Sequence, residues 1–167
     1  TTAHWFSLPA GLYRRLDVAP GEVAEGLAGI AHAMHGMATL LLMCDMRDLG
    51  RCIGDRSGGW FAPHLIEGAP VFDDMSNAGG ASPAAGENSE PTMFIYDNFP
   101  GGIGLARRLW ELHDTLVRRT YELVSACRCA EGCPSCIGPQ ASIESSAKKT
   151  AIGILKLLME EGCGLDC

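Results

Sequence analysis

Four cysteines lie within ten residues of the chain, in the run Cys127-Arg-Cys129-Ala-Glu-Gly-Cys133-Pro-Ser-Cys136. Thiolates are strong ligands for zinc, and four of them complete its preferred tetrahedral shell without leaving a position for water. Gly132 and Pro134 favour the sharp turns that a loop this short needs to surround an ion. The spacing therefore predicts a structural zinc site whose ligands are Cys127, Cys129, Cys133 and Cys136.

Two other chemistries could use the same four thiols. An iron–sulfur cluster is one, because a proline follows Cys133 as in some cluster-binding runs, although those runs have other spacings. Two local disulfides are the other, but loops this small would be strained. No secretory signal is visible, so we expect a reducing, cytoplasmic compartment, which also disfavours disulfides.

Three aspartates offer a different kind of chemistry. Asp45, Asp48 and Asp97 could converge on a divalent ion and make the chain a magnesium-dependent, nuclease-like enzyme. No companion Glu or Lys completes a recognisable pattern, and the capping of turns and helix ends is sufficient to explain them. Cys163 and Cys167 form the basis of a third hypothesis, a redox or partner-binding module.

Two further patterns have a structural and a functional interpretation. His32 and His35 share one helix face, yet no nearby motif supplies more ligands, so we interpret them as structural. The run from Pro100 to Gly104 opens a helix whose free amides could hold a phosphate or a carboxylate. Because this run lacks the last small residue of the dinucleotide fingerprint, a tight turn that packs the helix against a sheet is preferred.

A few elements must position these residues. Strands are predicted from Trp5 to Leu8 and from Thr92 to Asp97, and a further one is plausible around 60–66. Helices are predicted over 23–43, from 105 to at least 123, and after Ser142 or Ser145. On the second helix a stripe of leucines is predicted to be buried: Leu105, Leu109, Leu112, Leu116 and Leu123. On the third helix the residues predicted to face the core are Ala147, Ala151, Ile154 and Leu158.

These elements predict an α+β fold in which a small mixed sheet is packed by two or three long helices. The zinc knuckle, residues 127–139, would lie between the last two helices. At 167 residues the chain is expected to form one module, 1–167, and its Met-less start suggests a piece of a longer polypeptide. The Gly-, Ala-, Ser- and Pro-rich stretch 73–90 is predicted to be a mobile insertion.

Charge and hydropathy exclude two classes of partner. The 18 residues 27–44 carry no formal charge, but two histidines, two glycines and acidic flanks predict a buried core helix and no membrane contact. The net charge of -7 argues against a surface that binds nucleic acid on its own. On the helix after Gly104, Arg107 and Arg118 share their side with acidic residues and are interpreted as a solvated, ion-paired face.

The most specific motifs together resemble a known family. They are Tyr96-Asp97 with Pro100-Gly101-Gly102 and Gly104, and then Cys127-x-Cys129-x3-Cys133-Pro-Ser-Cys136-x-Gly138-Pro139; Asp45-x2-Asp48-Leu-Gly50 fits less specifically. The chain is similar over most of its length to the zinc-binding domain of unknown function at the C-terminus of MrfA-type DEAD/DEAH-box helicases. The insertion at 76–90 departs from the family pattern.

The resemblance implies that Cys127, Cys129, Cys133 and Cys136 bind zinc in a module attached to an ATP-dependent superfamily 2 helicase engaged in DNA repair. Its expected partners are the helicase core of the parent chain and, through the full-length protein, DNA. The expected role is accessory, bracing the core and contributing to single-stranded DNA handling. The helicase motifs are absent from these residues, so by itself the chain is expected to hydrolyse no ATP and to be no enzyme.

Overall fold

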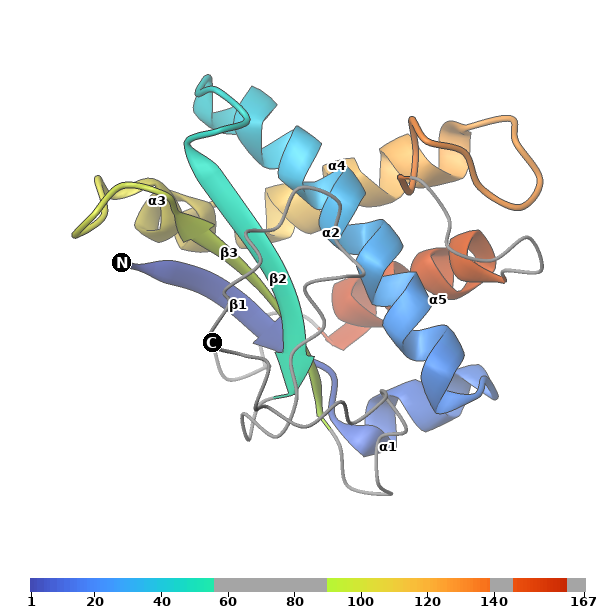
Figure 1. The fold of residues 1–167 in the computed structure, drawn as a ribbon. Coiled ribbons are helices and arrows are strands. Elements are labelled where there is room, and N and C mark those ends of the chain that lie inside the picture. Colours follow the sequence, from blue (N-terminus) through green and yellow to red (C-terminus); the bar gives the residue numbers. More distant parts are fainter. Residues whose placement is uncertain (56–89, 139–145, 162–167) are drawn as a thin grey trace, which may run out of the picture.

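The computed structural model describes residues 1–55, 90–138 and 146–161, which form a three-stranded sheet with helices packed on one of its faces (Figure 1). The possible strand at 60–66, the insertion 73–90 except Glu90, and Cys163 and Cys167 lie outside these ranges. In chain order the elements are β1 (Ala3–Ser7), α1 (Ala10–Tyr13), a 3₁₀ turn η1 (Arg14–Leu16), α2 (Pro20–Leu42), β2 (Leu49–Asp55), β3 (Pro91–Asp97), α3 (Leu105–Glu111), α4 (His113–Ala126) and α5 (Ala147–Glu161).

The α+β class is confirmed, but the sheet is antiparallel where a mixed sheet was predicted. The strand order is β1-β3-β2, and β3 pairs antiparallel with both neighbours, Phe6 opposite Met93 and Leu49 opposite Asp97. β1 and β2 therefore run in the same direction, as strands joined through a helix commonly do. Because β3 is inserted between them, no parallel pair is formed.

The core lies between the sheet and α2. Phe6, Ile53, Met93 and Ile95 come from alternate strand positions and are fully buried. α2 presents Val23, Leu27, Ile30 and Met34 at helical spacing, and these too are completely covered, as predicted for a buried helix. The helix is followed by its C-cap, Met43, which has a left-handed backbone conformation. Within the described ranges, no helix combines the length and apolar character needed to cross a membrane.

The single helix predicted after Gly104 is two helices, because Leu112 leaves the helical conformation (φ −101°, ψ 11°). α3 packs beside β1 and β3, whereas α4 packs against α2 and α5 (Figure 1). Leu109 and Leu116 are fully buried, but Leu123 is 38% exposed, since the change of direction ends the predicted stripe. The buried face of α4 consists of His113, Leu116, Val117, Thr120 and Val124.

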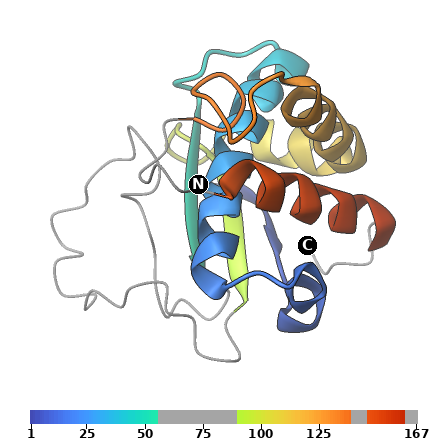
Figure 2. The same ribbon diagram turned by 90° about the vertical axis from the view of Figure 1, so that its right-hand side faces the viewer.

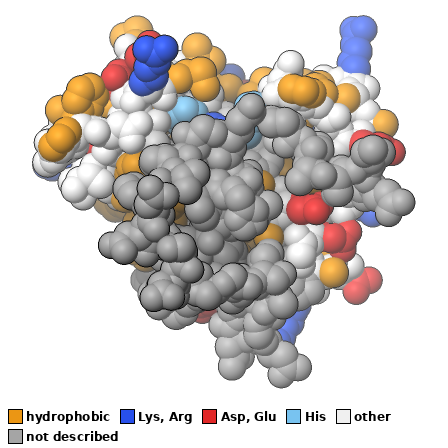
Figure 3. All heavy atoms as spheres, viewed as in Figure 1, with side chains coloured by type: hydrophobic (Ala, Val, Ile, Leu, Met, Phe, Trp, Pro, Cys, Tyr) orange, Lys and Arg blue, Asp and Glu red, His pale blue; other side chains and the backbone are white. Residues whose placement is uncertain are grey.

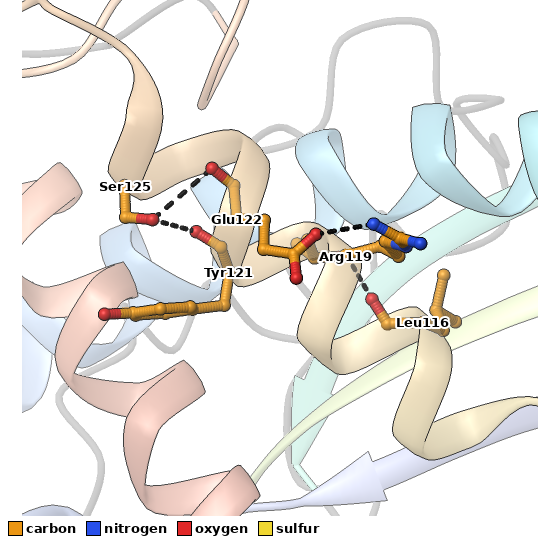
Figure 4. A network of polar contacts seen from close by, with 6 residues as sticks. Leu116, Arg119, Tyr121, Glu122 and Ser125 are labelled. Atoms are coloured by element: carbon orange, nitrogen blue, oxygen red, sulfur yellow. Dashed lines mark hydrogen bonds and ion pairs between the residues drawn. The ribbon is translucent and has the colours of Figure 1, made fainter.

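The predicted ion-paired face is confirmed for Arg107, whereas further ion pairs on these two helices involve Arg108 and Arg119, and Arg118 is exposed. Arg107 and Arg108 both approach Glu111, at 3.9 and 2.5 Å, and Arg119 donates to Glu122 at 2.9 Å. Figure 4 shows the Arg119–Glu122 pair beside the last turn of α4, where the Ser125 hydroxyl donates to the Tyr121 carbonyl at 2.6 Å. Exposed pairs of this kind contribute little to stability, and they leave few free cations on this face.

α5 completes the helical layer by packing across α2 and beside α4 (Figure 2). It begins directly after Ser146, whose hydroxyl donates to the Glu22 carboxylate in the first turn of α2. The inward residues predicted for it, Ala147, Ala151, Ile154 and Leu158, are all buried. The loop that carries the four cysteines therefore connects two helices that are both fixed to α2.

Candidate metal centre

The cysteine loop starts where α4 stops. Ala126 is the last helical residue, and Cys127 is extended (φ −67°, ψ 130°), which turns the chain out of the helix axis. A tight turn then closes from Cys133, whose carbonyl accepts the N–H groups of Cys136 at 3.0 Å and Ile137 at 3.1 Å. In the same turn the Cys133 N–H points at the Cys136 sulfur, 3.3 Å away. Backbone geometry alone thus brings the last two thiols together.

The four sulfur atoms form one cluster, the only group of three or more His, Cys, Asp or Glu ligand atoms of this kind in residues 1–55, 90–138 and 146–161. All lie within 4.8 Å of one another, and the Sγ–Sγ distances are 3.6 Å for Cys127–Cys133, 3.5 Å for Cys129–Cys136 and 3.6 Å for Cys133–Cys136. Four ligands about 2.3 Å from a tetrahedral zinc ion would be separated by roughly 3.8 Å. The cluster has the size of a metal site, and all four cysteines are free thiols without a disulfide.

Two contacts hold this loop against α2. A Cβ atom on Gly29 of α2 would lie 2.9 Å from Cβ of Ile137, and one on Gly138 would lie 2.8 Å from the ring of His32. Both distances are shorter than real Cβ contacts allow, so at each point a side chain of one segment rests directly on a glycine of the other. The 2% exposed Ile137 is the apolar residue at this contact, next to Cys136.

The local hydrogen bonds favour thiolate at two of the four positions. Backbone N–H groups of Ser135 and Cys136, together with the Cys127 thiol, lower the pKa of Cys133 to about 6. Burial opposes ionisation of Cys129, but hydrogen bonds from Cys127, Cys136 and Lys148 outweigh it and lower the pKa of that thiol. Burial raises the pKa of Cys136 to about 12. Since a metal binds the thiolate form, the surroundings of Cys133 and Cys129 favour a metal ligand, whereas the burial of Cys136 opposes its ionisation.

Lys148, in the first turn of α5, was not predicted to take part in this site. Its ammonium group donates to the carbonyl oxygens of Cys127 at 2.7 Å and Cys129 at 2.6 Å, and it lies 3.4 Å from the Cys129 sulfur. The sequence does contain a signal, because Lys148 is three residues before Ala151 and seven before Leu155, both buried. Helical periodicity therefore directs it inward.

The other candidate ligands are occupied elsewhere. His35 donates through Nε2 to the Leu49 carbonyl at 2.9 Å and accepts at Nδ1 from Arg51 at 2.9 Å, which confirms its structural role. Asp45 and Asp48 accept backbone N–H groups of their own turn. The nuclease alternative thus lacks a convergent site in the described part of the chain.

The backbone amides of the glycine-rich turn bind the carboxylate of Asp97. It is 1% exposed, and its carboxylate accepts the N–H groups of Ile103 at 2.9 Å, Gly104 at 3.1 Å and Ala106 at 3.0 Å. A Cβ on Gly102 would lie 2.9 Å from the same carboxylate, and Gly102 has a φ of +74°. The tight-turn interpretation is confirmed: the amides at the start of α3 are capped by the chain itself and are not available to a phosphate.

A family model and two relatives match the chain in sequence. The family is described as the MrfA Zn-binding domain and matches residues 30–137, a stretch that includes all four cysteines. The ATP-dependent helicase YprA of Bacillus subtilis (strain 168), itself uncharacterized, is 25% identical over 140 residues, or 84% of this chain and 15% of the helicase. An uncharacterized protein of Methanocaldococcus jannaschii, MJ1572.1, is 35% identical over 80 residues, which cover 44% of this chain and 71% of that protein.

A solved structure has the same fold. In a crystal structure of the DUF1998 helicase MrfA bound to DNA, the similar part has a TM-score of 0.58 and 24% sequence identity, over 84% of this chain and 15% of that one. The chain therefore spans about 15% of the length of the two helicases that it resembles.

Proposed function

This chain belongs to the MrfA Zn-binding domain family, and from that premise we propose that it is a zinc-stabilised accessory domain of an ATP-dependent DNA helicase. The zinc ion is held by Cys127, Cys129, Cys133 and Cys136. Four protein ligands close its coordination shell, so the ion has a structural and not a catalytic role. The proposal includes a reducing, cytoplasmic compartment, in which the thiols remain available to the metal.

The observation that carries this proposal is the sulfur cluster itself. Its four Sγ atoms come from a loop that is fixed at both ends, by α4 on one side and α5 on the other, and Ile137 packs it against α2. An ion at the centre of the cluster would therefore tie three helices together. An iron–sulfur cluster is the alternative use of four cysteines, and metal analysis separates it from zinc.

An accessory role is supported by an exposed apolar surface at one end of the molecule. Leu40, Met43 and Met46 are 71%, 92% and 54% exposed at the end of α2, and Ile103 is 61% exposed in the glycine turn. These two turns are joined, because the Asn98 side chain donates to the Arg47 carbonyl at 2.8 Å. Large apolar side chains exposed on neighbouring turns are candidates for an interaction surface, and we assign these to the contact with the helicase core. In this proposal the domain braces the helicase core of a protein engaged in DNA repair. It handles single-stranded DNA only together with that core.

Metal analysis of the purified protein tests the zinc assignment. We expect about one zinc ion per chain. Cys133→Ser removes one ligand and should lose the ion and about 3 kcal/mol or more of unfolding free energy, because binding free energy is folding free energy in such a site. Cys44→Ser makes the same chemical change outside the cluster and should keep both zinc and stability.

Three results would contradict the proposal. A brown, iron-containing protein would show that the cysteines bind an iron–sulfur cluster and not zinc. A folded protein without metal would show that no metal is needed. Equal zinc contents in Cys133→Ser and wild type would show that Cys133 is not a ligand.

A further inference from the structure

The ammonium group of Lys148 is buried beside the sulfur cluster. The residue is 6% exposed, and lysine is seldom covered to this degree unless its charge is compensated. Its compensation comes from the cysteine loop: two carbonyl oxygens, those of Cys127 and Cys129, and the sulfur of Cys129. The neighbouring Lys149 is exposed on the same helix turn, so burial is specific to one of two adjacent lysines.

The charge of the proposed centre explains why a cation is placed there. A divalent zinc ion with four thiolates carries a formal charge of about −2, which is costly in a partly buried site. One ammonium group at 3.4 Å from a ligand sulfur reduces that excess. The two carbonyl contacts also fix the backbone on both sides of Arg128, and with it the direction of the first two ligand sulfurs.

We infer that Lys148 is a positioning residue of the metal centre, which holds Cys127 and Cys129 in place and makes retention of the ion depend on the docking of α5. The inference rests on the zinc binding proposed above. Because Lys148 comes from an element outside residues 127–136, the cysteine run alone does not form the complete site. Partners that orient ligands in this way commonly change metal affinity by about 10- to 100-fold when they are removed.

The rate of zinc transfer from the loaded chain to an excess of a chromogenic chelator tests the inference. Lys148→Met keeps the length of the side chain but removes its charge and donors, and should release zinc about tenfold faster or more. Lys148→Arg keeps the charge and several donors and should stay within about threefold of wild type. Lys149→Met is the matched control on the same turn and should leave the rate unchanged.

Wild type and Lys148→Met releasing zinc at the same rate would overturn the inference, as would Lys148→Arg releasing it as fast as Lys148→Met. Should Lys148→Met fail to fold, Lys148→Gln, which keeps donors but not the charge, is compared with wild type under the same two criteria. The thiolate-to-cobalt absorption of the Co²⁺-loaded protein provides a second readout, since a change in its energy reports on the ligand sulfurs and not on overall stability. A wild-type chain without zinc would instead contradict the proposed function, before any variant is compared.

Discussion

Two histidines meet in the interior between β1 and α4. His4 is 2% exposed, and its Nε2 lies 3.3 Å from Nδ1 of His113, with the two rings edge to face. The other nitrogen of His4, Nδ1, is buried without a hydrogen-bond partner. Burial, and secondarily the charge of His113, lower the pKa of His4 to about 4, and burial lowers that of His113 as well. Both rings are therefore neutral in the folded protein at pH 7.

This pair makes the fold sensitive to mild acid. In the unfolded chain His4 takes up a proton near its ordinary pKa of about 6.5, whereas in the folded chain it does so only near 4. Its contribution to stability is complete above pH 6.5 and is lost as the pH falls toward 4. Between pH 7 and pH 5 the loss should be about 2 kcal/mol.

Urea unfolding of wild type and His4→Phe at these two pH values measures this contribution. Phenylalanine keeps an aromatic ring against His113 but cannot titrate, so its stability should fall by about 2 kcal/mol less than that of wild type. The acid-sensitive groups that do not contact His4 are common to both proteins and cancel in the comparison. Parallel losses in the two proteins would exclude His4 as the acid-sensitive group.

The roles of some single residues could be predicted from the sequence, and those of others could not. The four cysteines were identified from their spacing, and the structure brings them together as that spacing required. Asp97 was interpreted as a capping residue in preference to a metal ligand, and the structure confirms capping, but its partners could not be identified, because a sequence does not show that the side chain reaches the amides seven and nine residues ahead. Lys148 was overlooked for the same reason, since its partners lie about twenty residues away.

At the scale of elements, the contact of α2 with α5 depends on a glycine. A Cβ on Gly26 would lie 2.7 Å from Cγ2 of Thr150 and 3.3 Å from the backbone nitrogen of Ala151. Gly36, on the same helix, has nothing within 4 Å of that position. Gly26 is thus a packing requirement, whereas Gly36 has no neighbour that needs its small size.

Alanine at these two positions should have opposite effects. Gly26→Ala must push α5 away from α2 and should destabilise the protein by about 1–3 kcal/mol. Gly36→Ala adds no contact and improves helix propensity, which should stabilise it by about 0.5–1 kcal/mol. Thermal or chemical unfolding of both variants decides the matter, and a loss of stability at Gly36 equal to that at Gly26 would contradict the packing explanation.

The elements that sequence patterns predicted are those with a long apolar period or a β-branched run. α2, α5, β1 and β3 were found, each within a few residues of its observed ends. β2 was missed because Leu49–Asp55 contains two glycines and no alternating pattern. Its pairing with β3 makes it a strand, and Gly50 gives the ring of Tyr96 room across the sheet, since a Cβ there would lie 2.3 Å from that ring. Pairing of this kind is decided by tertiary contacts.

For the whole molecule, charge decides what the domain can do with DNA alone. The chain carries a net charge of -7, and on the face in Figure 3 the basic side chains of the described residues are scattered and form no continuous strip. Three of the arginines on α3 and α4 are paired with glutamates. The excess of acidic over basic side chains, 20 against 13, opposes the approach of a phosphate backbone.

The isolated domain should therefore bind a single-stranded oligonucleotide weakly. We expect a dissociation constant of roughly 10–100 µM or weaker at physiological salt, and an affinity that falls further as salt is added. Fluorescence anisotropy over a salt series measures both. Tight binding that does not respond to salt would show that the domain holds DNA without the helicase core.

The strand order has a consequence for how the chain is made. β3 is the central strand of the sheet, yet it is the last of the three to leave the ribosome, after β1, α2 and β2. Until residue 97 has been synthesised, β1 and β2 have no strand between them, and the cysteine loop is at least 30 residues further on. The first third of the chain, as it is synthesised, thus contains two strands without a pairing partner and an apolar helix. Exposed segments of this kind are prone to aggregate and are typical substrates of chaperones. The sheet is complete only once residue 97 has been synthesised, and the four cysteines are all present only once residue 136 has been added.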